Sequence, residues 1–182
     1  MSYRRLWVFV EGSDDERFFT SVIEPICQET YSFVKPFRYA QEKAEKVQAF
    51  LQSVRSMRSD YLLWGDINSL PCVTAKKDRL IADHGQALTA KNIIVVIKEI
   101  ESWYLAGLDS EASKKLGIKV PGKTDELTKE DFDSLVPRKF DSRIDFMIEV
   151  LKRFSVATAR KKNRSFDYFM SSLSVAIEKT NE

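Results

Sequence analysis

Short apolar runs alternate along the chain with segments in which apolar residues recur every three or four positions. Three runs have the length and β-branched or aromatic character of buried strands: Leu6 to Val10, Tyr61 to Trp64 and Ile93 to Ile97. A fourth run, Tyr31 to Tyr39, contains Pro36. Because proline has no backbone N–H to donate to a neighbouring strand, this run is predicted to be an edge or bent strand.

Helical periodicity follows the predicted strands. Apolar side chains lie at helical spacing in 18–26, 44–54 and 100–104, and Pro71 is predicted to open a further helix that runs toward Gly85. Parallel strands need crossover connections, so repeated strand-helix alternation predicts an α/β fold. We expect a mostly parallel four-stranded sheet with flanking helices.

The second half of the chain is predicted to be organised differently. Residues 109–140 are charged, carry two glycines and two prolines, and show little apolar periodicity, whereas 144–151 and 166–177 each carry one helical stripe. These patterns predict three parts. We expect an α/β core at residues 1–108, a loop-rich insertion or cap at 109–140, and C-terminal helices at 141–182 packed on the core.

Composition narrows the classes of function. The 29 basic and 27 acidic residues nearly cancel, so any site for a polyanion must be local. The two cysteines and the single histidine, His84, match no zinc spacing, and we interpret His84 as an ordinary structural residue. No apolar run approaches the ~20 residues of a membrane span, and the N-terminus does not resemble a signal peptide. We therefore expect a cytoplasmic protein without membrane contact, and the sequence leaves its oligomeric state open.

Acidic residues follow three of the four predicted strands. Glu11 comes after the first, Asp66 after the third, and Glu99 and Glu101 after the fourth. In parallel sheets, ligands bind in the crevice beyond the carboxyl ends of the strands. Carboxylates gathered there repel one another and call for a positive charge, and an all-oxygen ligand set favours Mg²⁺ or Mn²⁺. The sequence therefore predicts a metal site at this edge of the sheet.

The segment after the first strand has the form E-G-x-x-D, from Glu11 to Asp15. Glu11 ends the strand, Gly12 allows the backbone to turn, Ser13 or Asp14 caps the helix, and Asp15 points back from its first turn. This segment resembles the first motif of the TOPRIM domain, which is found in topoisomerases, primases and OLD-type nucleases.

Three further segments extend this resemblance from Leu6 to Phe169. Asp66-Ile67-Asn68 is similar to the TOPRIM D-x-D motif, with asparagine in the place of its second aspartate. The segment from Lys98 to Ala106 resembles the third block of a small, uncharacterised bacterial TOPRIM-like group related to OLD-type and phage-defence nucleases. Asn163-Arg164-Ser165-Phe166-x-x-Phe169 resembles the closing block of that group.

The resemblance implies a Mg²⁺- or Mn²⁺-dependent phosphoryl-transfer enzyme, with a nuclease acting on DNA or RNA as its expected form. It implies general acid/base work for Glu11 and metal binding for Asp66, with Asp15 and Glu101. Glu11 is also expected as a metal ligand. Asn68 would coordinate through its carbonyl, and Glu99 or Glu101 would replace the charge that Asn68 lacks. Since residues two apart on a helix do not share a face, only one of these two is expected to reach the site, and we favour Glu101.

Lysines and arginines supply the expected contacts to nucleic acid. Lys98 is expected to be a catalytic residue that neutralises the acidic cluster or contacts phosphate, and a plain surface lysine is the alternative. Two basic segments are expected to contact the nucleic-acid backbone, although each can equally be a solvated face: Lys76 and Lys77, and Arg160, Lys161, Lys162 and Arg164. Asp14 and Glu16 are assigned to the helix N-terminus, where negative charge opposes the helix dipole.

Two other interpretations remain. The asparagine at position 68 favours a non-catalytic TOPRIM-like subunit that binds a partner, such as an ATPase in a defence system. Receiver domains also place acids after the first strand, an aspartate after the third and a lysine near a later strand end, as Asp14, Asp15, Asp66 and Lys98 do. The expected order of strands and the long chain after Gly107 argue against a receiver domain. No tyrosine positioned for covalent catalysis is evident.

Overall fold

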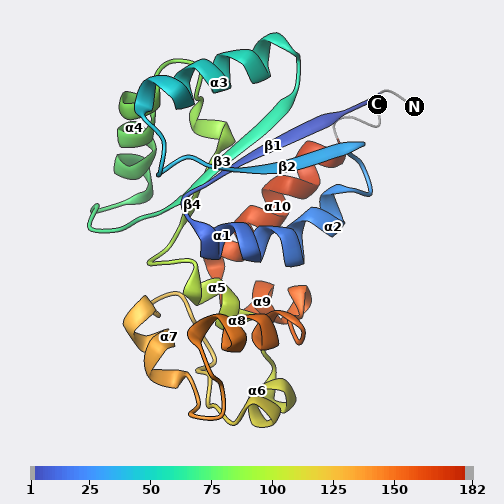
Figure 1. The fold of residues 1–182 in the computed structure, drawn as a ribbon, viewed down its shortest axis with the longest axis vertical. Helices are drawn as coiled ribbons and strands as arrows, with labels where there is room; N and C mark the ends of the chain where they lie inside the picture. Colours follow the sequence, from blue (N-terminus) through green and yellow to red (C-terminus); the bar gives the residue numbers. More distant parts are fainter. Residues whose placement is uncertain (1–2, 179–182) are drawn as a thin grey trace. The chain divides into compact units, whose positions relative to one another are not determined.

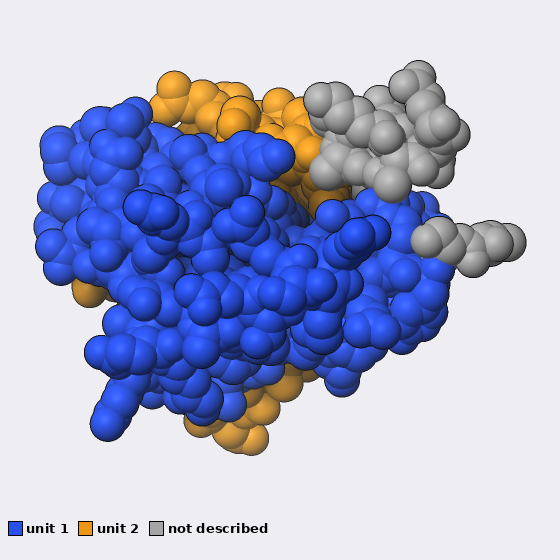
Figure 2. Space-filling view, turned by 90° about the horizontal axis from the view of Figure 1, so that it is seen from above, with its two compact units in different colours: residues 1–95 blue, residues 96–182 orange. Residues whose placement is uncertain are grey.

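The computed structural model describes residues 3–178 and, within them, the side chains of residues 3–173. The chain forms two compact units, Met1–Val95 and Val96–Glu182, coloured separately in Figure 2. This division falls earlier than the boundary predicted at residue 108. Residues 179–182 of the predicted C-terminal part, and the Ile177 side chain of its last apolar stripe, lie outside the described part.

The four predicted strands form one parallel sheet in the order β2-β1-β3-β4 (Figure 1). The strands are β1 (Arg5–Val10), β2 (Phe33–Arg38), β3 (Asp60–Asp66) and β4 (Ile93–Val96). The inner strand β1 pairs on one side with β2 and on the other with β3. The prediction of an α/β fold with a four-stranded parallel sheet is confirmed, and Pro36 lies in the edge strand β2 as its chemistry requires.

This strand order creates a switch point in the sheet. From β1 the chain moves to β2 on one side, and β3 then returns to the other side of β1. The order matches the first four strands of the flavodoxin-like doubly wound arrangement, in which ligands bind outside the carboxyl ends of the strands where the order reverses. The site position that this order favours is therefore the gap between the ends of β1 and β3.

Helices cover both faces of the sheet in unit 1. Figure 1 shows α3 (Ala44–Ser56) and α4 (Val73–His84) on one side of the strands, and α1 (Ser13–Phe18) and α2 (Glu24–Cys27) on the other. A π-helical turn at Phe19–Ile23 joins α1 to α2, and a 3₁₀ turn at Ala90–Asn92 precedes β4.

The core beneath α3 and α4 follows from helical spacing. Val47, Leu51 and Val54 of α3 are buried against Phe9 and Leu63 of the sheet. Their i, i+4, i+7 pattern places all three on one face of the helix. The predicted helix after Pro71 begins at Val73 and ends before Gly85, whose φ of 83° is a backbone conformation that favours glycine.

Unit 2 is built from helices, most of them short. They are α5 (Glu101–Ala106), α6 (Ser110–Leu116), α7 (Lys129–Leu135), α8 (Arg143–Leu151), α9 (Val156–Lys162) and α10 (Arg164–Glu178). The segment predicted to be loop-rich thus contains α6 and α7. Side-chain caps begin both helices, because Asp109 accepts a hydrogen bond from Ala112 N and Thr128 accepts one from Asp131 N. Apolar periodicity detects such capped, one- to two-turn helices poorly.

A polar network inside unit 2 holds the start of α10. Asn163 accepts hydrogen bonds from the Ser165 hydroxyl and from Phe166 N, and it donates to Ser102 and Thr124. Trp103, which is fully buried, donates its indole N–H to Ser165 at 2.8 Å. The segment that begins at Asn163 therefore works as a helix cap and core anchor. Within residues 3–178, none of the helices is both long and apolar enough to cross a bilayer.

Candidate functional site

Three carboxylates of unit 1 gather at the switch point. Glu11 directly follows β1, Asp66 ends β3, and Asp15 lies in the first turn of α1. Glu11 Oε2 accepts a hydrogen bond from Asp66 N at 2.9 Å, so the side chain after one strand is tied to the end of its neighbour. Asp15 is 5% exposed and its Oδ2 accepts a hydrogen bond from Gly12 N at 3.0 Å, which turns its carboxylate back toward the strand end.

The hydroxyl of Tyr39 lies among these carboxylates. Tyr39 follows β2, and its backbone N donates to Val10 O at 3.0 Å. Burial raises the pKa of Tyr39 well above its usual value, and the negative charges of Glu11, Asp15 and Asp66 raise it further. Among the described residues the buried hydroxyl has no hydrogen-bond partner. The three acids and this hydroxyl thus form one cluster, which we call the carboxylate cluster.

Tyr39 was not predicted as a site residue from the sequence. A signal was present, because parallel strands end at the same edge of a sheet and Tyr39 directly follows the aromatic run of β2. An aromatic residue at the end of such a run is equally typical of strand packing, so the sequence alone does not reveal the polar role of the Tyr39 hydroxyl. Tyr39 remains protonated because its pKa is raised, so it is a hydrogen-bond donor here and is not poised as a nucleophile.

Gly65 leaves the space in which the Tyr39 hydroxyl and the Glu11 carboxylate lie close together. A Cβ built on Gly65 would lie 2.7 Å from the Tyr39 hydroxyl and 3.0 Å from Glu11 Oε2. It would also lie 3.3 Å from Lys76 Cε. The side chains of Tyr39, Glu11 and Lys76 therefore border the same point beside β3, and a side chain at position 65 would displace them.

Lys76 and His84 come to this region from α4. Lys76 is 7% exposed, and its ammonium forms no hydrogen bond or ion pair within the described part of the chain. The His84 ring makes an edge contact with Tyr39 at a centroid distance of 5.3 Å. Burial lowers the pKa of His84, and the charge of Lys76 adds to this effect while Asp83 opposes it. Lys76 was expected in a surface patch for nucleic acid, and its contact with nucleic acid stays a prediction although most of its side chain is buried.

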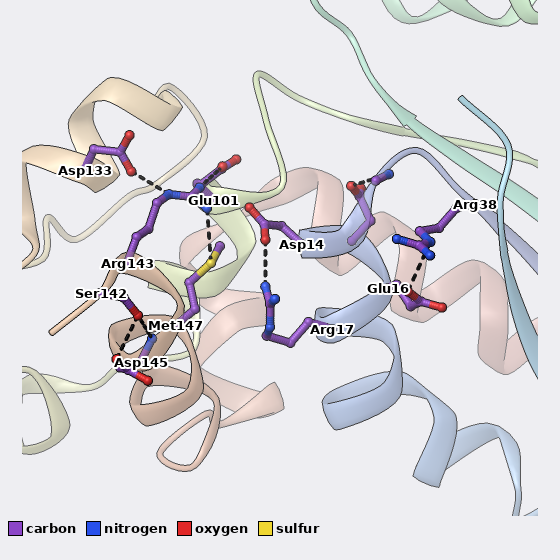
Figure 3. Close-up of polar contacts among 12 residues, drawn as sticks. Asp14, Glu16, Arg17, Arg38, Glu101, Asp133, Ser142, Arg143, Asp145 and Met147 are labelled. Atoms are coloured by element: carbon purple, nitrogen blue, oxygen red, sulfur yellow. Dashed lines mark hydrogen bonds and ion pairs between the residues drawn. The ribbon is translucent and has the colours of Figure 1, made fainter. Parts of the chain in front are cut away.

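The other acids near α1 have ordinary surface roles. Asp14 pairs with Arg17 at 2.6 Å and Glu16 pairs with Arg38 at 3.4 Å (Figure 3). Asn68 has a φ of 54°, and its side-chain amide donates to Asp66 O at 3.2 Å. Asparagine is one of the few residues that tolerate this backbone conformation, which gives a local reason for its presence in the D-x-D position.

The charged residues after β4 contact other parts of unit 2. Lys98 pairs with Glu126 at 3.4 Å, and the Glu99 carboxylate accepts the backbone N–H of Lys129 at the start of α7. Glu101 is 4% exposed and forms an ion pair with Arg143, as Figure 3 shows. Lys98, Glu99 and Glu101 therefore each have a structural role within unit 2. Metal binding by Glu99, by Glu101 and by Asn68 of unit 1 stays a prediction.

Three residues of the predicted basic run at 160–164 contact other residues of unit 2. Arg160 pairs with Asp167 at 2.6 Å, Lys162 donates to Leu108 O at 2.7 Å, and Arg164 lies 3.5 Å from Asp125. Lys77, in unit 1, donates to Ala90 O at 2.9 Å. Lys161 is exposed. Phosphate binding by these cations stays a prediction.

A basic groove in unit 2 was not expected from the sequence. It has a volume of about 620 Å³ and is lined by Lys114, Lys119 and Lys162 together with Asp109. Lys114 and Lys119 are exposed, and among the described residues neither forms an ion pair. The lysines come from α6, the loop after it and α9, so only the tertiary structure gathers them. We call this feature the lysine groove.

The donor set of the carboxylate cluster decides what kind of metal site it could form. Within residues 3–178, no group of three or more His, Cys, Asp or Glu side chains is arranged to hold a metal ion. The donors are nevertheless all oxygen, and the buried Tyr39 hydroxyl lacks a partner among the described residues. Mg²⁺ takes one or two carboxylates directly and keeps several waters, and its binding by these residues stays a prediction.

No protein-family model, curated protein or solved structure matches this chain. The chemistry of the carboxylate cluster therefore has to be inferred from its own geometry.

Proposed function

We propose that this protein is a TOPRIM-like phosphoryl-transfer enzyme that uses Mg²⁺ or Mn²⁺, and that it cleaves DNA or RNA. The observation that carries the proposal is the gathering of Glu11, Asp15 and Asp66 around the Tyr39 hydroxyl at the switch point of a parallel sheet. A cation bound both by these carboxylates and by a substrate phosphate would account for the concentrated negative charge at this position.

Each residue has a role in this proposal. Asp66 and Asp15 would hold the cation, which supplies charge stabilisation at the phosphate and lowers the pKa of bound water. Glu11 would act as general acid/base, and its hydrogen bond to Asp66 N fixes its orientation. Tyr39 would donate a hydrogen bond to water or to a phosphate oxygen, since its hydroxyl is protonated and lies in the cluster.

Cleavage assays test the proposal. Purified protein is incubated with single- and double-stranded DNA and RNA in Mg²⁺ and in Mn²⁺, alone and with a partner ATPase. Glu11→Gln and Asp66→Asn should each lower cleavage by orders of magnitude while folding is retained. Glu16→Gln is the matched control, because Glu16 belongs to the same segment but pairs with Arg38 at the surface. Equal cleavage by wild type and Glu11→Gln would identify a contaminating nuclease.

A receiver-like phosphoryl acceptor is the second candidate, and the strand order favours it. The expected strand order counted against a receiver domain, whereas the observed order β2-β1-β3-β4 matches the first four strands of that doubly wound class. Asp66 ends β3, and its charge and that of Asp15 both act on the Tyr39 hydroxyl; an acceptor aspartate needs a second acid nearby to hold its cation.

Labelling of Asp66 separates the two candidates. Incubation with acetyl phosphate and Mg²⁺, followed by mass spectrometry, should show no phosphorylated Asp66 if the protein is a nuclease. A labelled Asp66 whose signal disappears in Asp66→Asn, together with no cleavage of any nucleic acid, would favour the acceptor. If neither activity is found, the non-catalytic binding subunit becomes the preferred interpretation.

A further inference from the structure

The Lys76 side chain packs beside the carboxylate cluster. Its Cε borders the same point beside Gly65 as Glu11 Oε2 and the Tyr39 hydroxyl. It is 7% exposed, and its ammonium makes no ion pair or hydrogen bond within residues 3–178. A cation on a side chain packed in this way loses part of its hydration, and opposite charges nearby offset that loss. The three carboxylates at the switch point are the charges placed to do so.

We propose that Lys76 is the internal counter-ion of the carboxylate cluster, and that its charge sets how tightly the cluster binds a divalent cation. Both Lys76 and a divalent cation act on the same acids, so each weakens the binding of the other through like-charge repulsion. Lys76 is thus a positioning residue that stabilises the acids. The first half of the inference stands independently of the proposed function, and the second half rests on it.

A purely apolar role for Lys76 is the competing explanation. Lys76, Leu80 and His84 share the buried face of α4, and a lysine stem can pack like a hydrophobic side chain. Charge and packing are separable because methionine has nearly the same length and volume as the lysine stem. Lys76→Met therefore keeps the packing and removes the charge, whereas Lys76→Arg keeps the charge.

The counter-ion role is tested without metal by a double-mutant cycle. The unfolding constant in urea is measured for wild type, Lys76→Met, Glu11→Gln and the double variant at one pH. Lys76→Met should raise the unfolding constant about tenfold in wild type and much less in the Glu11→Gln background. Lys76→Gln provides a second neutral variant if Lys76→Met folds poorly. Equal effects in both backgrounds would overturn the counter-ion role.

The effect on cation binding is tested with Mn²⁺ alone by titration calorimetry. Lys76→Met should lower the Kd for Mn²⁺ about fivefold or more, because the competing charge is gone. Lys76→Arg should bind like wild type. Lys35→Met is the matched control: it removes one exposed lysine of β2 and so makes the same change in net charge.

The outcomes separate this inference from the proposed function. If Mn²⁺ binds wild type and Lys76→Met equally well, the control of cation affinity by Lys76 is wrong while the metal site survives. If Mn²⁺ binds neither protein but the cycle shows coupling, the counter-ion role stands and the metal-dependent function fails. Coupling together with tighter Mn²⁺ binding supports both halves.

Discussion

At the scale of single residues, the candidate site depends on Gly65, which has no side chain, and on the hydroxyl of Tyr39. Gly65 leaves room beside β3, and Tyr39 and Glu11 occupy it. Neither glycine nor tyrosine belongs to the acidic pattern that first marks this part of the sequence. The acids provide charge, whereas these two residues decide whether the charges can come together.

Gly65→Ala should destabilise the protein by about 1–3 kcal/mol, because the new methyl group would overlap the Tyr39 hydroxyl. Adding Tyr39→Phe removes the overlapping oxygen, so the double variant should recover part of the stability. Urea denaturation measures both changes. Gly122→Ala is the control, since nothing lies within 4 Å of a Cβ at that position. A Gly65→Ala protein as stable as Gly122→Ala would contradict the packing described beside β3.

His84 should make stability depend on pH. Burial lowers its folded-state pKa below the usual 6.5, so the unfolded chain binds a proton more readily than the folded protein does. Its full contribution is present above about pH 6.5 and is lost as the pH falls through the folded-state pKa. His84→Phe, which keeps a ring against Tyr39, should flatten the change in unfolding free energy between about pH 7.5 and 5.5.

The part of the pH-dependent stability change that His84→Phe removes can be assigned to the imidazole, because His84 is the only histidine of the chain. Urea midpoints at several pH values provide the measurement. If His84→Phe and wild type are destabilised equally over this range, the burial of a neutral imidazole is refuted.

At the scale of elements, capping and ion pairing organise unit 2. Arg143, at the start of α8, forms an ion pair with Glu101 of α5 and a second with Asp133 of α7 at 2.6 Å (Figure 3). One guanidinium thereby ties three short helices together. The Glu99 carboxylate caps α7 in a similar way. The acids after β4 therefore stabilise the arrangement of the unit 2 helices whether or not a metal is bound.

Arg143→Met should cost about 3 kcal/mol of unfolding free energy, because it leaves the buried Glu101 carboxylate without this cation. Combining it with Glu101→Leu should recover much of that stability, since both charges are then removed. The comparison is Lys115→Met, which breaks the exposed pair with Glu111 and should cost less than about 0.5 kcal/mol. Equal destabilisation by Arg143→Met and Lys115→Met would argue against a structural role for the Arg143 pair.

At the scale of the whole molecule, charge is balanced overall but unevenly distributed within each unit. Unit 1 concentrates carboxylates at its switch point, and unit 2 gathers lysines in the lysine groove. A net charge of +2 conceals this pattern. For a protein that acts on nucleic acid, the exposed lysines of the groove, Lys114 and Lys119, are better placed to meet phosphates than the ion-paired run around Arg160.

Under the proposed function, replacing Lys114 and Lys119 with glutamine should weaken binding to nucleic acid and lower its salt dependence. The slope of log K against log salt should become shallower by about 0.7–0.9 for each phosphate that the protein no longer neutralises. Fluorescence anisotropy with a labelled oligonucleotide measures both quantities. Lys35→Gln with Lys91→Gln, two exposed lysines of unit 1, controls for net charge. A larger effect from neutralising Arg160 and Lys161 would return the interface to the basic run.

The sequence by itself determined the four strands, most of the helices and the acids that follow the strands. These features are local, because strand and helix periodicity and capping chemistry are properties of neighbouring residues. Even the asparagine at position 68 has a local cause in its backbone conformation. The short capped helices α6 and α7 were not predicted from the sequence, because their starts depend on single side-chain hydrogen bonds.

The tertiary structure alone decided which of these residues meet. Strand order places Glu11 beside the end of β3, and it brings Tyr39, Gly65 and Lys76 to the same point from three separate segments. It also ties Glu101 to Arg143 and collects the lysine groove from α6 and α9. Such contacts join residues far apart in the chain, and their formation depends on how whole faces pack. No periodicity within a segment encodes that packing.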